Sequence, residues 1–230
     1  MKCESCFFLF LSPLFFITSE LYSQSYPDAG LWTTFNIEYS LNTRTSVLVT
    51  QECRLKENYS RLNLLYSNLG FEYRILKSFK AALTYRFVNK YQDDNAMSYR
   101  HRLMLDLTLK NKFGKLNVSY RHRLQVEGRD LYSSESGRVP EWYSRNKFEV
   151  KYDIEKRYTP YVSAEFRYQF YDPRNVESNS TWHRNRYVTG IDYKINDKNK
   201  VGLYYLIQHE YNVSLPETQF IIGLEYSLSL

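Results

Sequence analysis

Apolar and polar residues alternate along most of this chain, most clearly between Ser98 and Glu127. In the first half of this stretch, Leu103, Leu105, Leu107 and Leu109 share one face, and Arg100, Arg102, Met104, Asp106 and Thr108 share the other. In the second half, Leu116, Val118, Tyr120, His122, Leu124 and Val126 oppose Asn117, Ser119, Arg121, Arg123, Gln125 and Glu127. Because a period of two is the period of a strand, the pattern predicts a hairpin that turns at residues 110–114.

The apolar face of this hairpin is unbroken over roughly 9–11 residues, the length that a tilted strand needs to cross a bilayer. A Lys or Arg on the lipid face at mid-depth would cost ~2–4 kcal/mol. A slip of one residue would place Arg121 and Arg123 there, so the register is strongly fixed. The pattern therefore favours a membrane-spanning hairpin.

Similar alternation recurs along the whole chain after residue 28. The predicted strands are 29–40, 45–55, 62–74, 79–88, 98–109, 115–127, 145–154, 160–171, 184–194, 200–211 and 218–230. Connections near residues 41, 75, 112, 156 and 197 are short, and those near 58, 93, 136, 178 and 214 are mostly longer. These features predict an all-β fold, an antiparallel up-and-down transmembrane barrel of about 10–12 strands with short periplasmic turns and longer extracellular loops.

The readable strands are eleven, whereas bacterial single-chain barrels have an even number. If the last strand ends in the periplasm, the first strand begins outside. We therefore expect the segment from Gln24 to Gly30 to lie inside the barrel or to pair at its edge.

Composition agrees with a membrane barrel. The chain has 17% aromatic residues, including 23 Tyr, yet its mean hydropathy is −0.56, because polar lumen and loop residues dilute the apolar belt. Residues 7–17 form a short apolar core that predicts a signal peptide over residues 1–23 and a single barrel domain over residues 24–230. Cys3 and Cys6 precede this core, whereas a lipoprotein cysteine would follow it.

Cysteine and charge exclude several classes of site and partner. Cys53 is the single cysteine of the mature chain, so neither a disulfide framework nor a thiolate metal cluster is expected. Removal of the signal peptide changes the formal net charge from +6 to +7, since one Lys and two Glu are lost. Because this modest excess alternates along strands, nucleic acid is not expected as a partner, and no cofactor or metal is expected.

The candidate functional residues are charged side chains on the polar face. They are Arg100, Arg102, Asp106, Arg121, Arg123, Glu127, Glu149, Glu165 and Arg167. The predicted turn would bring four arginines together at the outer mouth of the lumen, beside Gln125, and such a cluster needs acidic partners. One interpretation is a salt-bridged lumen that braces a narrow barrel. The other is a site for a small anionic solute, because rings of Arg or Lys favour anions in pores.

The polar face leaves four functions open. The first is a narrow pore or solute-binding channel, and the second is a sealed structural or adhesive barrel. A lipid acyl hydrolase is a weaker alternative, because His101 and His122 lie on the apolar face but no serine lies on that face at hydrogen-bond spacing. The last is a soluble lipocalin-like barrel whose apolar face lines a ligand cavity. No sequence motif of an enzyme is found, so no enzymatic activity is expected.

A resemblance to a known family rests on short motifs in order. They are DAGLW at 28–32, NIEY at 36–39, QECR at 51–54, LGFEY at 69–73, YRF at 85–87, RHR at 100–102, RNK at 145–147, PYVSAE at 160–165, RYVTG at 186–190 and ETQFIIG at 217–223. Together they resemble the domain-of-unknown-function 2490 family, predicted outer-membrane barrels of Gram-negative bacteria. The resemblance implies outer-membrane lipid and lipopolysaccharide as surroundings, but no activity and no site residue.

Overall fold

The computed structural model describes residues 27–92, 96–130, 138–154, 157–174, 179–213 and 216–230. The predicted signal peptide, residues 1–23, lies outside the described residues, as do residues 24–26 and residues 131–137 of the predicted loop 128–144. The strands are β1 (Pro27–Ser40), β2 (Thr45–Lys56), β3 (Arg61–Leu76), β4 (Phe79–Tyr91), β5 (Met97–Phe113), β6 (Leu116–Arg129), β7 (Glu141–Tyr152), β8 (Tyr158–Tyr171), β9 (Thr181–Lys194), β10 (Asn199–Glu210) and β11 (Thr218–Ser229).

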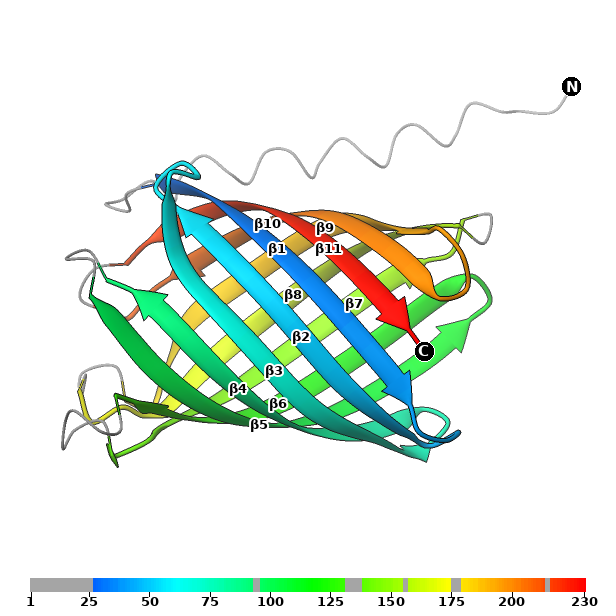
Figure 1. Ribbon diagram of the computed structural model, residues 1–230, viewed down its shortest axis with the longest axis horizontal. Coiled ribbons are helices and arrows are strands. Elements are labelled where there is room, and N and C mark those ends of the chain that lie inside the picture. The colour runs from blue at the N-terminus through cyan, green and yellow to red at the C-terminus, as the bar shows by residue number, and fades with distance from the viewer. Residues whose placement is uncertain (1–26, 93–95, 131–137, 155–156, 175–178, 214–215) are drawn as a thin grey trace, which may run out of the picture.

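These strands form one closed barrel (Figure 1). Strands that follow one another in sequence pair antiparallel, and β1 closes the barrel by pairing in parallel with β11, from Pro27 opposite Thr218 to Glu38 opposite Ser229. The parallel pair is a geometric consequence of an odd strand number, because alternating strands leave the first and the last with the same direction. The all-β, up-and-down transmembrane barrel predicted from the alternation is confirmed.

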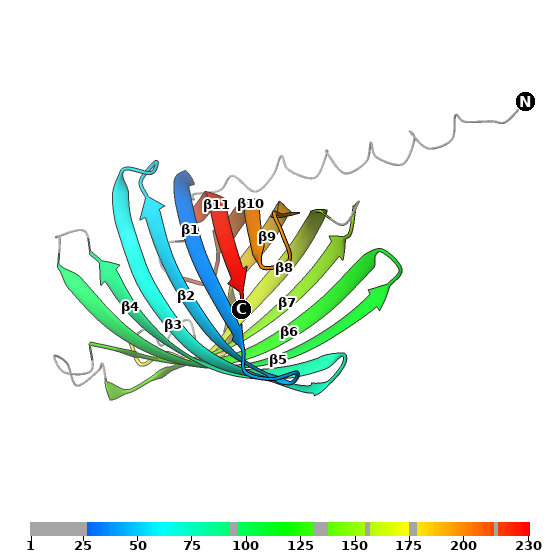
Figure 2. The ribbon, with the colours of Figure 1, turned by 45° about the vertical axis from the view of Figure 1, so that its right-hand side comes forward.

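The odd strand number left open whether the segment before the first strand lies inside the barrel or pairs at its edge. Residues 27–30 continue β1 and pair with β11 at the barrel wall, so they do not thread the lumen. Figure 2 shows β1 and β11 running side by side along the seam. No helix among the described residues is long and apolar enough to cross a membrane.

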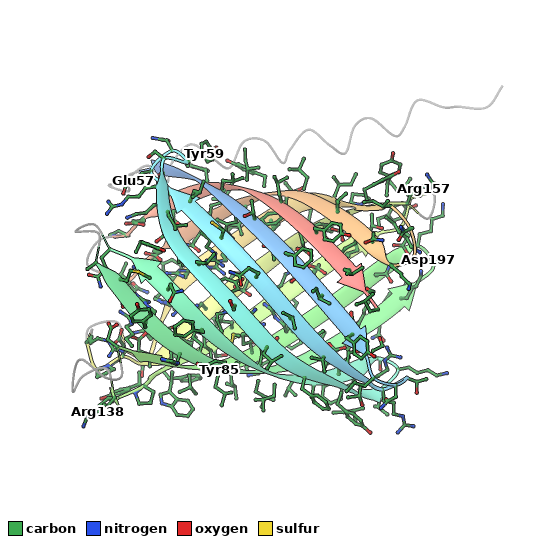
Figure 3. The ribbon with its side chains drawn as sticks, viewed as in Figure 1. Glu57, Tyr59, Tyr85, Arg138, Arg157 and Asp197 are labelled. Carbon is green, nitrogen blue, oxygen red and sulfur yellow. The ribbon has the colours of Figure 1, made fainter. Side chains whose placement is uncertain are left out.

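The two faces of the barrel are those that the alternation predicted. Leucine 103 and its neighbours on the apolar stripe face outward, with Leu69 60% and Leu103 50% exposed. Tyr85 projects from the outer surface in Figure 3. Arg86 and Met104, one residue further along their strands, are buried inside. Such exposure of large apolar side chains is the surface that hydrocarbon lipid covers.

The connections differ between the two ends. At one end they are residues 41–44, 77–78, 114–115, 153–157 and 195–198; at the other they are 57–60, 92–96, 130–140, 172–180 and 211–217. Figure 3 labels Arg157 and Asp197 at the short-turn end and Arg138 at the opposite end. The predicted asymmetry of loop length is therefore present.

The register of the central hairpin differs from the prediction. β5 continues to Phe113 and the chain turns tightly at Gly114 and Lys115, where Gly114 adopts φ +61°. This left-handed conformation suits glycine, which has no Cβ. The longer strand moves the pairing, so Arg102 lies opposite Glu127 and not opposite another arginine. The predicted cluster of Arg100, Arg102, Arg121 and Arg123 is therefore wrong as a set of neighbours, although all four side chains line the lumen.

Candidate functional site: the charged lumen

The lumen contains a cavity of about 1380 Å³ whose wall is strongly charged. Its lining includes 17 Lys and Arg side chains against 11 Asp and Glu. Asp106 and Glu141 also pair with lining arginines, yet the cations still exceed the acids when these two are added. The described part of the lumen therefore carries a net positive charge.

Three ion pairs cross the central hairpin. The Nε and Nη2 atoms of Arg123 donate to both oxygens of Asp106 at 2.5 and 2.6 Å. Glu127, which is 1% exposed, accepts from Arg100 at 3.1 Å and lies 2.5 Å from Nε of Arg102. These residues of the predicted site are thus held as paired charges, as a buried charge requires.

Glu165 of β8 is the centre of a second group. It accepts a hydrogen bond from Nη2 of Arg121 at 2.7 Å and from Nε of Arg145 at 3.1 Å, and Nη1 of Arg186 lies 3.5 Å away. Side chains from β6, β7 and β9 therefore converge on one carboxylate. Glu149 is separate from this group, because its partners are Lys147 at 2.6 Å and Lys151 at 3.6 Å.

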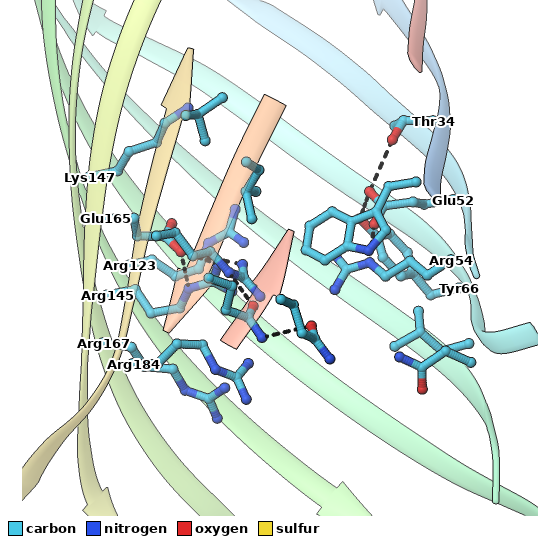
Figure 4. Close-up of a pocket in the computed structure, with 18 of the residues that line it drawn as sticks. Thr34, Glu52, Arg54, Tyr66, Arg123, Arg145, Lys147, Glu165, Arg167 and Arg184 are labelled. Atoms are coloured by element: carbon cyan, nitrogen blue, oxygen red, sulfur yellow. Dashed lines mark hydrogen bonds and ion pairs between the residues drawn. The ribbon is translucent and has the colours of Figure 1, made fainter. Parts of the chain in front are cut away.

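Four arginines lie directly opposite one another on adjacent strands, and we call them the arginine arc. They are Arg123, Arg145, Arg167 and Arg184, paired in that order across β6, β7, β8 and β9. Figure 4 shows all four on the same side of the cavity. Like charges directly opposite on strands destabilise a sheet. Sequence reasoning missed the arc because the alternation shows which face a residue is on, but not which residue faces it on the next strand.

Three members of the arc have an acidic partner, namely Asp106 for Arg123, Glu165 for Arg145 and Glu210 for Arg184. Arg167 differs: within the described residues its guanidinium has no carboxylate partner, and it stacks on the ring of Tyr143 at 3.6 Å. A cation–π contact lowers the cost of burying a cation but leaves its charge in place. Arg167 is therefore an unneutralised cation in the middle of the arc.

The opposite wall is a closed network around Glu52 of β2, on the other side of the cavity in Figure 4. Glu52 accepts hydrogen bonds from Thr34, Arg54 and Tyr66. Arg54 also stacks on Trp32 at 3.5 Å. Glu52 and Arg54 neutralise each other, and Arg86, which stacks on Tyr66 at 3.7 Å, donates from Nε to Asn68 at 2.7 Å.

The outward face contains one polar group that sequence reasoning missed. β7 begins at Glu141, so Ser144 belongs to a strand and not to a loop, and it lies opposite the exposed Leu124. Asn146 accepts hydrogen bonds from Tyr120 at 2.7 Å and lies 2.9 Å from Nδ1 of His122. Its amide nitrogen is 3.5 Å from Oγ of Ser144. The Ser144 side chain is only 6% exposed and its partner is the amide of Asn146, so the structure adds a serine to this face without placing it in hydrogen-bond contact with His122.

Within the described residues, no group of three or more His, Cys, Asp and Glu side chains is arranged to hold a metal ion. Cys53, a free thiol, is partly buried on the outward face of β2.

The closed sheet and its charged lumen define a transmembrane β-barrel. Among solved structures, the chain is similar to one described as the NanC porin in a rhombohedral crystal form, with 12% sequence identity and a TM-score of 0.50 over 78% of this chain and 85% of that one. At this identity the likeness supports the fold alone.

The family is shown by sequence. The model of the family "Protein of unknown function (DUF2490)" matches residues 29–219, so the chain belongs to this family. No curated protein matches the chain.

Proposed function

We propose that this protein is an outer-membrane barrel of a Gram-negative bacterium that forms a narrow channel favouring anions. The observation that carries the proposal is the excess of 17 cationic over 11 acidic side chains in the cavity wall. A positive lumen attracts anions and repels cations over the Debye length, about 8 Å at physiological salt. Small anionic solutes are the expected cargo, and outer-membrane lipid and lipopolysaccharide are the expected surroundings of the apolar belt.

Two cavities run along the proposed path. The larger one occupies the middle and the long-loop end of the lumen, and a second one of about 880 Å³ lies at the short-turn end. Both are lined by Asn36, Thr50, Asp192 and Lys200, so the two compartments meet at this level. Side chains narrow the middle of the lumen, where Arg186 of β9 reaches to 5.3 Å from the ring of Trp32 on β1. A path this narrow suits small hydrated ions and compact solutes.

Loop length supplies the orientation. In outer-membrane barrels short turns face the periplasm and long loops face outside. Turns such as 77–78 and 114–115 therefore mark the periplasmic end, and connections such as 130–140 and 172–180 mark the outside.

The test is current through the purified full chain in planar bilayers under a potassium chloride gradient. We expect channel steps and a reversal potential of the sign given by chloride permeation. The double variant Arg102→Gln/Arg123→Gln removes two positive charges from the wall, so the ratio of anion to cation permeability should fall. Arg44→Gln in the exposed turn 41–44 is the matched control and should leave it unchanged. A silent bilayer would favour the sealed structural barrel, and unchanged selectivity in the double variant would refute the role of the lumenal arginines.

A second candidate function, hydrolysis of lipid acyl esters, rests on the polar group at Ser144. Asn146 contacts both His122 and Ser144 on the outward face, and a serine, a histidine and an orienting amide are the parts of an acyl-transfer site. Asn146 lies between the two side chains and Ser144 is only 6% exposed, so the reaction requires Ser144 to rotate toward His122 and the lipid. After that rotation His122 takes the proton of Ser144 as Oγ attacks the ester carbonyl, and gives that proton to the leaving alcohol. Water then hydrolyses the acyl-enzyme and regenerates the serine.

Ester hydrolysis in mixed micelles of phospholipid and detergent tests this candidate. Wild type should release fatty acid, and Ser144→Ala and His122→Asn should abolish the release. Ser67→Ala is a matched control, because Ser67 is also an outward serine and its Oγ donates to Gln51 at 2.6 Å. No release by wild type, or equal loss in the control, would eliminate the candidate.

A further inference from the structure

One part of the arginine arc has more donors than the protein satisfies. Nε of Arg167 and Nε of Arg184 are both buried without a hydrogen-bond partner in the described structure. Nδ1 of His183 is buried in the same way, and the His183 side chain as a whole is 5% exposed. Because more than 90% of buried polar groups in proteins have a partner, three unsatisfied nitrogens on neighbouring residues require an explanation.

A β-bulge places these residues together. Arg167 lies opposite Arg184, whereas the next residue, Tyr168, lies opposite Trp182, so His183 is the extra residue of β9. The bulge turns His183 into the lumen, where it lines the cavity and stacks on Tyr143 with ring centroids 5.8 Å apart. Bulges recur beside functional sites, where they redirect a side chain.

Charge at this place favours an anion. Arg167 has Arg145 on one side and Arg184 on the other, and of the three it alone lacks a carboxylate partner in the described structure. Folding in the absence of a ligand therefore leaves one positive charge beside two like charges. A planar guanidinium in this position can bind a carboxylate or a phosphate with two parallel hydrogen bonds.

We propose that Arg167, Arg184 and His183 form a binding site for the oxyanion group of a small solute. The two guanidiniums bind the anionic oxygens, and the ring nitrogen of His183 contacts a polar atom next to them. The inference rests on the proposed function for its cargo, but it adds a defined site at which the cargo stops. A carboxylate and a phosphate share the chemistry, so both are used as probes.

The experiment measures binding at equilibrium, without any current. Purified full chain in detergent micelles is titrated calorimetrically with inorganic phosphate and separately with acetate, at constant ionic strength set by chloride. We expect saturable binding of at least one of the two probes, and the tighter one identifies the chemical class. The Arg167→Gln variant should bind that probe at least tenfold more weakly, and Arg44→Gln should bind as wild type does.

Stability provides an independent readout. Because Arg167 is unneutralised, Arg167→Gln should fold, as judged by heat-modifiable gel mobility, and its unfolding midpoint without ligand should equal or exceed that of wild type. The preferred probe should raise the midpoint of wild type and not that of the variant, since a ligand of the folded state stabilises it. His183→Phe keeps the ring stack and removes the nitrogens, so its binding should be weaker than wild type.

Two results would overturn the inference: no saturable binding of either probe to wild type, or equal binding by Arg167→Gln. Failure of the channel gives a different result. A protein that binds the probe but carries no current retains the site and loses the proposed pore. A protein that conducts anions but binds neither probe retains the pore and loses the site.

Discussion

The two walls of the lumen contain the same residue types, but these residues are paired differently on each wall. On the β1–β4 wall, Glu52 neutralises Arg54 and accepts from Tyr66, and the aromatic rings cover the guanidiniums. On the β6–β9 wall, four arginines face one another and Arg167 has no carboxylate partner among the described residues. The first wall also has an arginine without a carboxylate partner among the described residues, Arg86, but its Nε donates to Asn68 at 2.7 Å. On the second wall Nε of Arg167 is buried without a hydrogen-bond partner in the described structure, which costs stability and is typical of a site shaped for a ligand.

The largest loss in the free energy of unfolding is expected when the central carboxylate of the β6–β9 wall, Glu165, is removed. Glu165→Gln leaves Arg121, Arg145 and Arg186 without their shared carboxylate. Removing one partner of a buried ion pair leaves uncompensated charge, and we expect a loss of about 3 kcal/mol in the free energy of unfolding. Urea unfolding of the barrel in lipid vesicles measures it. A loss below that of the next variant would show that the two walls do not differ in this way.

The corresponding change on the other wall is Glu52→Gln. Glutamine retains an oxygen that accepts from Tyr66, and Arg54 keeps its contact with Trp32. The expected loss is therefore smaller, about 2 kcal/mol, the size of a buried polar group left partly unsatisfied. The same urea series provides the measurement, and a loss as large as that of Glu165→Gln would contradict the idea that the aromatic rings support this wall.

Tyr66→Phe sharpens the comparison by removing one hydroxyl. The ring remains in contact with Arg86, which lies 3.7 Å above it, and only the donor to Glu52 is lost. A single intramolecular hydrogen bond contributes about 1 kcal/mol, so we expect a loss of that size. No measurable change would mean that Thr34 and Arg54 already satisfy the carboxylate.

The smallest effect is expected for a pair exposed to water. Lys112 donates to Asp153 at 2.8 Å at the short-turn end, and this hydrogen bond lowers the pKa of the Asp153 carboxyl below its ordinary value. Because the folded-state pKa is depressed, the stabilisation is present above the ordinary aspartate pKa of 3.8 and disappears as the pH falls through the folded-state value.

Asp153→Asn should therefore cost less than about 1 kcal/mol at neutral pH, as exposed pairs do. The difference in unfolding free energy between variant and wild type should shrink in acid and in high salt. A difference that persists at pH 2 would show that Asp153 acts through packing and not through its charge.

The sequence was sufficient to predict which residues face outward and which face the lumen. It was insufficient to predict which residues lie opposite one another on adjacent strands. The alternation of Leu103 to Leu109 predicted the outward stripe, and eleven strands were readable because lipid tolerates almost no charge on that stripe. Pairing depends on turn geometry, and the tight turn at Gly114 moved every partner in the central hairpin. Arg145 and Arg184 escaped notice because only the register brings them beside Arg123 and Arg167.

Local irregularities of the strands could not be predicted from the alternation either. The bulge that turns His183 inward breaks the period of two, and a pattern search that relies on that period has no signal for it. The first residues of β7, Glu141 to Ser144, follow a polar segment and resemble a loop. A strand that extends beyond the bilayer carries no hydrophobic constraint at its end, so its start could not be located from apolar positions.

The parallel seam between β1 and β11 has a consequence for topology in the cell. β1 starts at the long-loop end and β11 finishes at the short-turn end, so an epitope joined just before Pro27 and one joined after Leu230 would be displayed on opposite sides of the membrane. Antibody labelling of intact cells should reach the first tag and require permeabilised cells for the second. In barrels with an even number of strands, both tags would share one compartment.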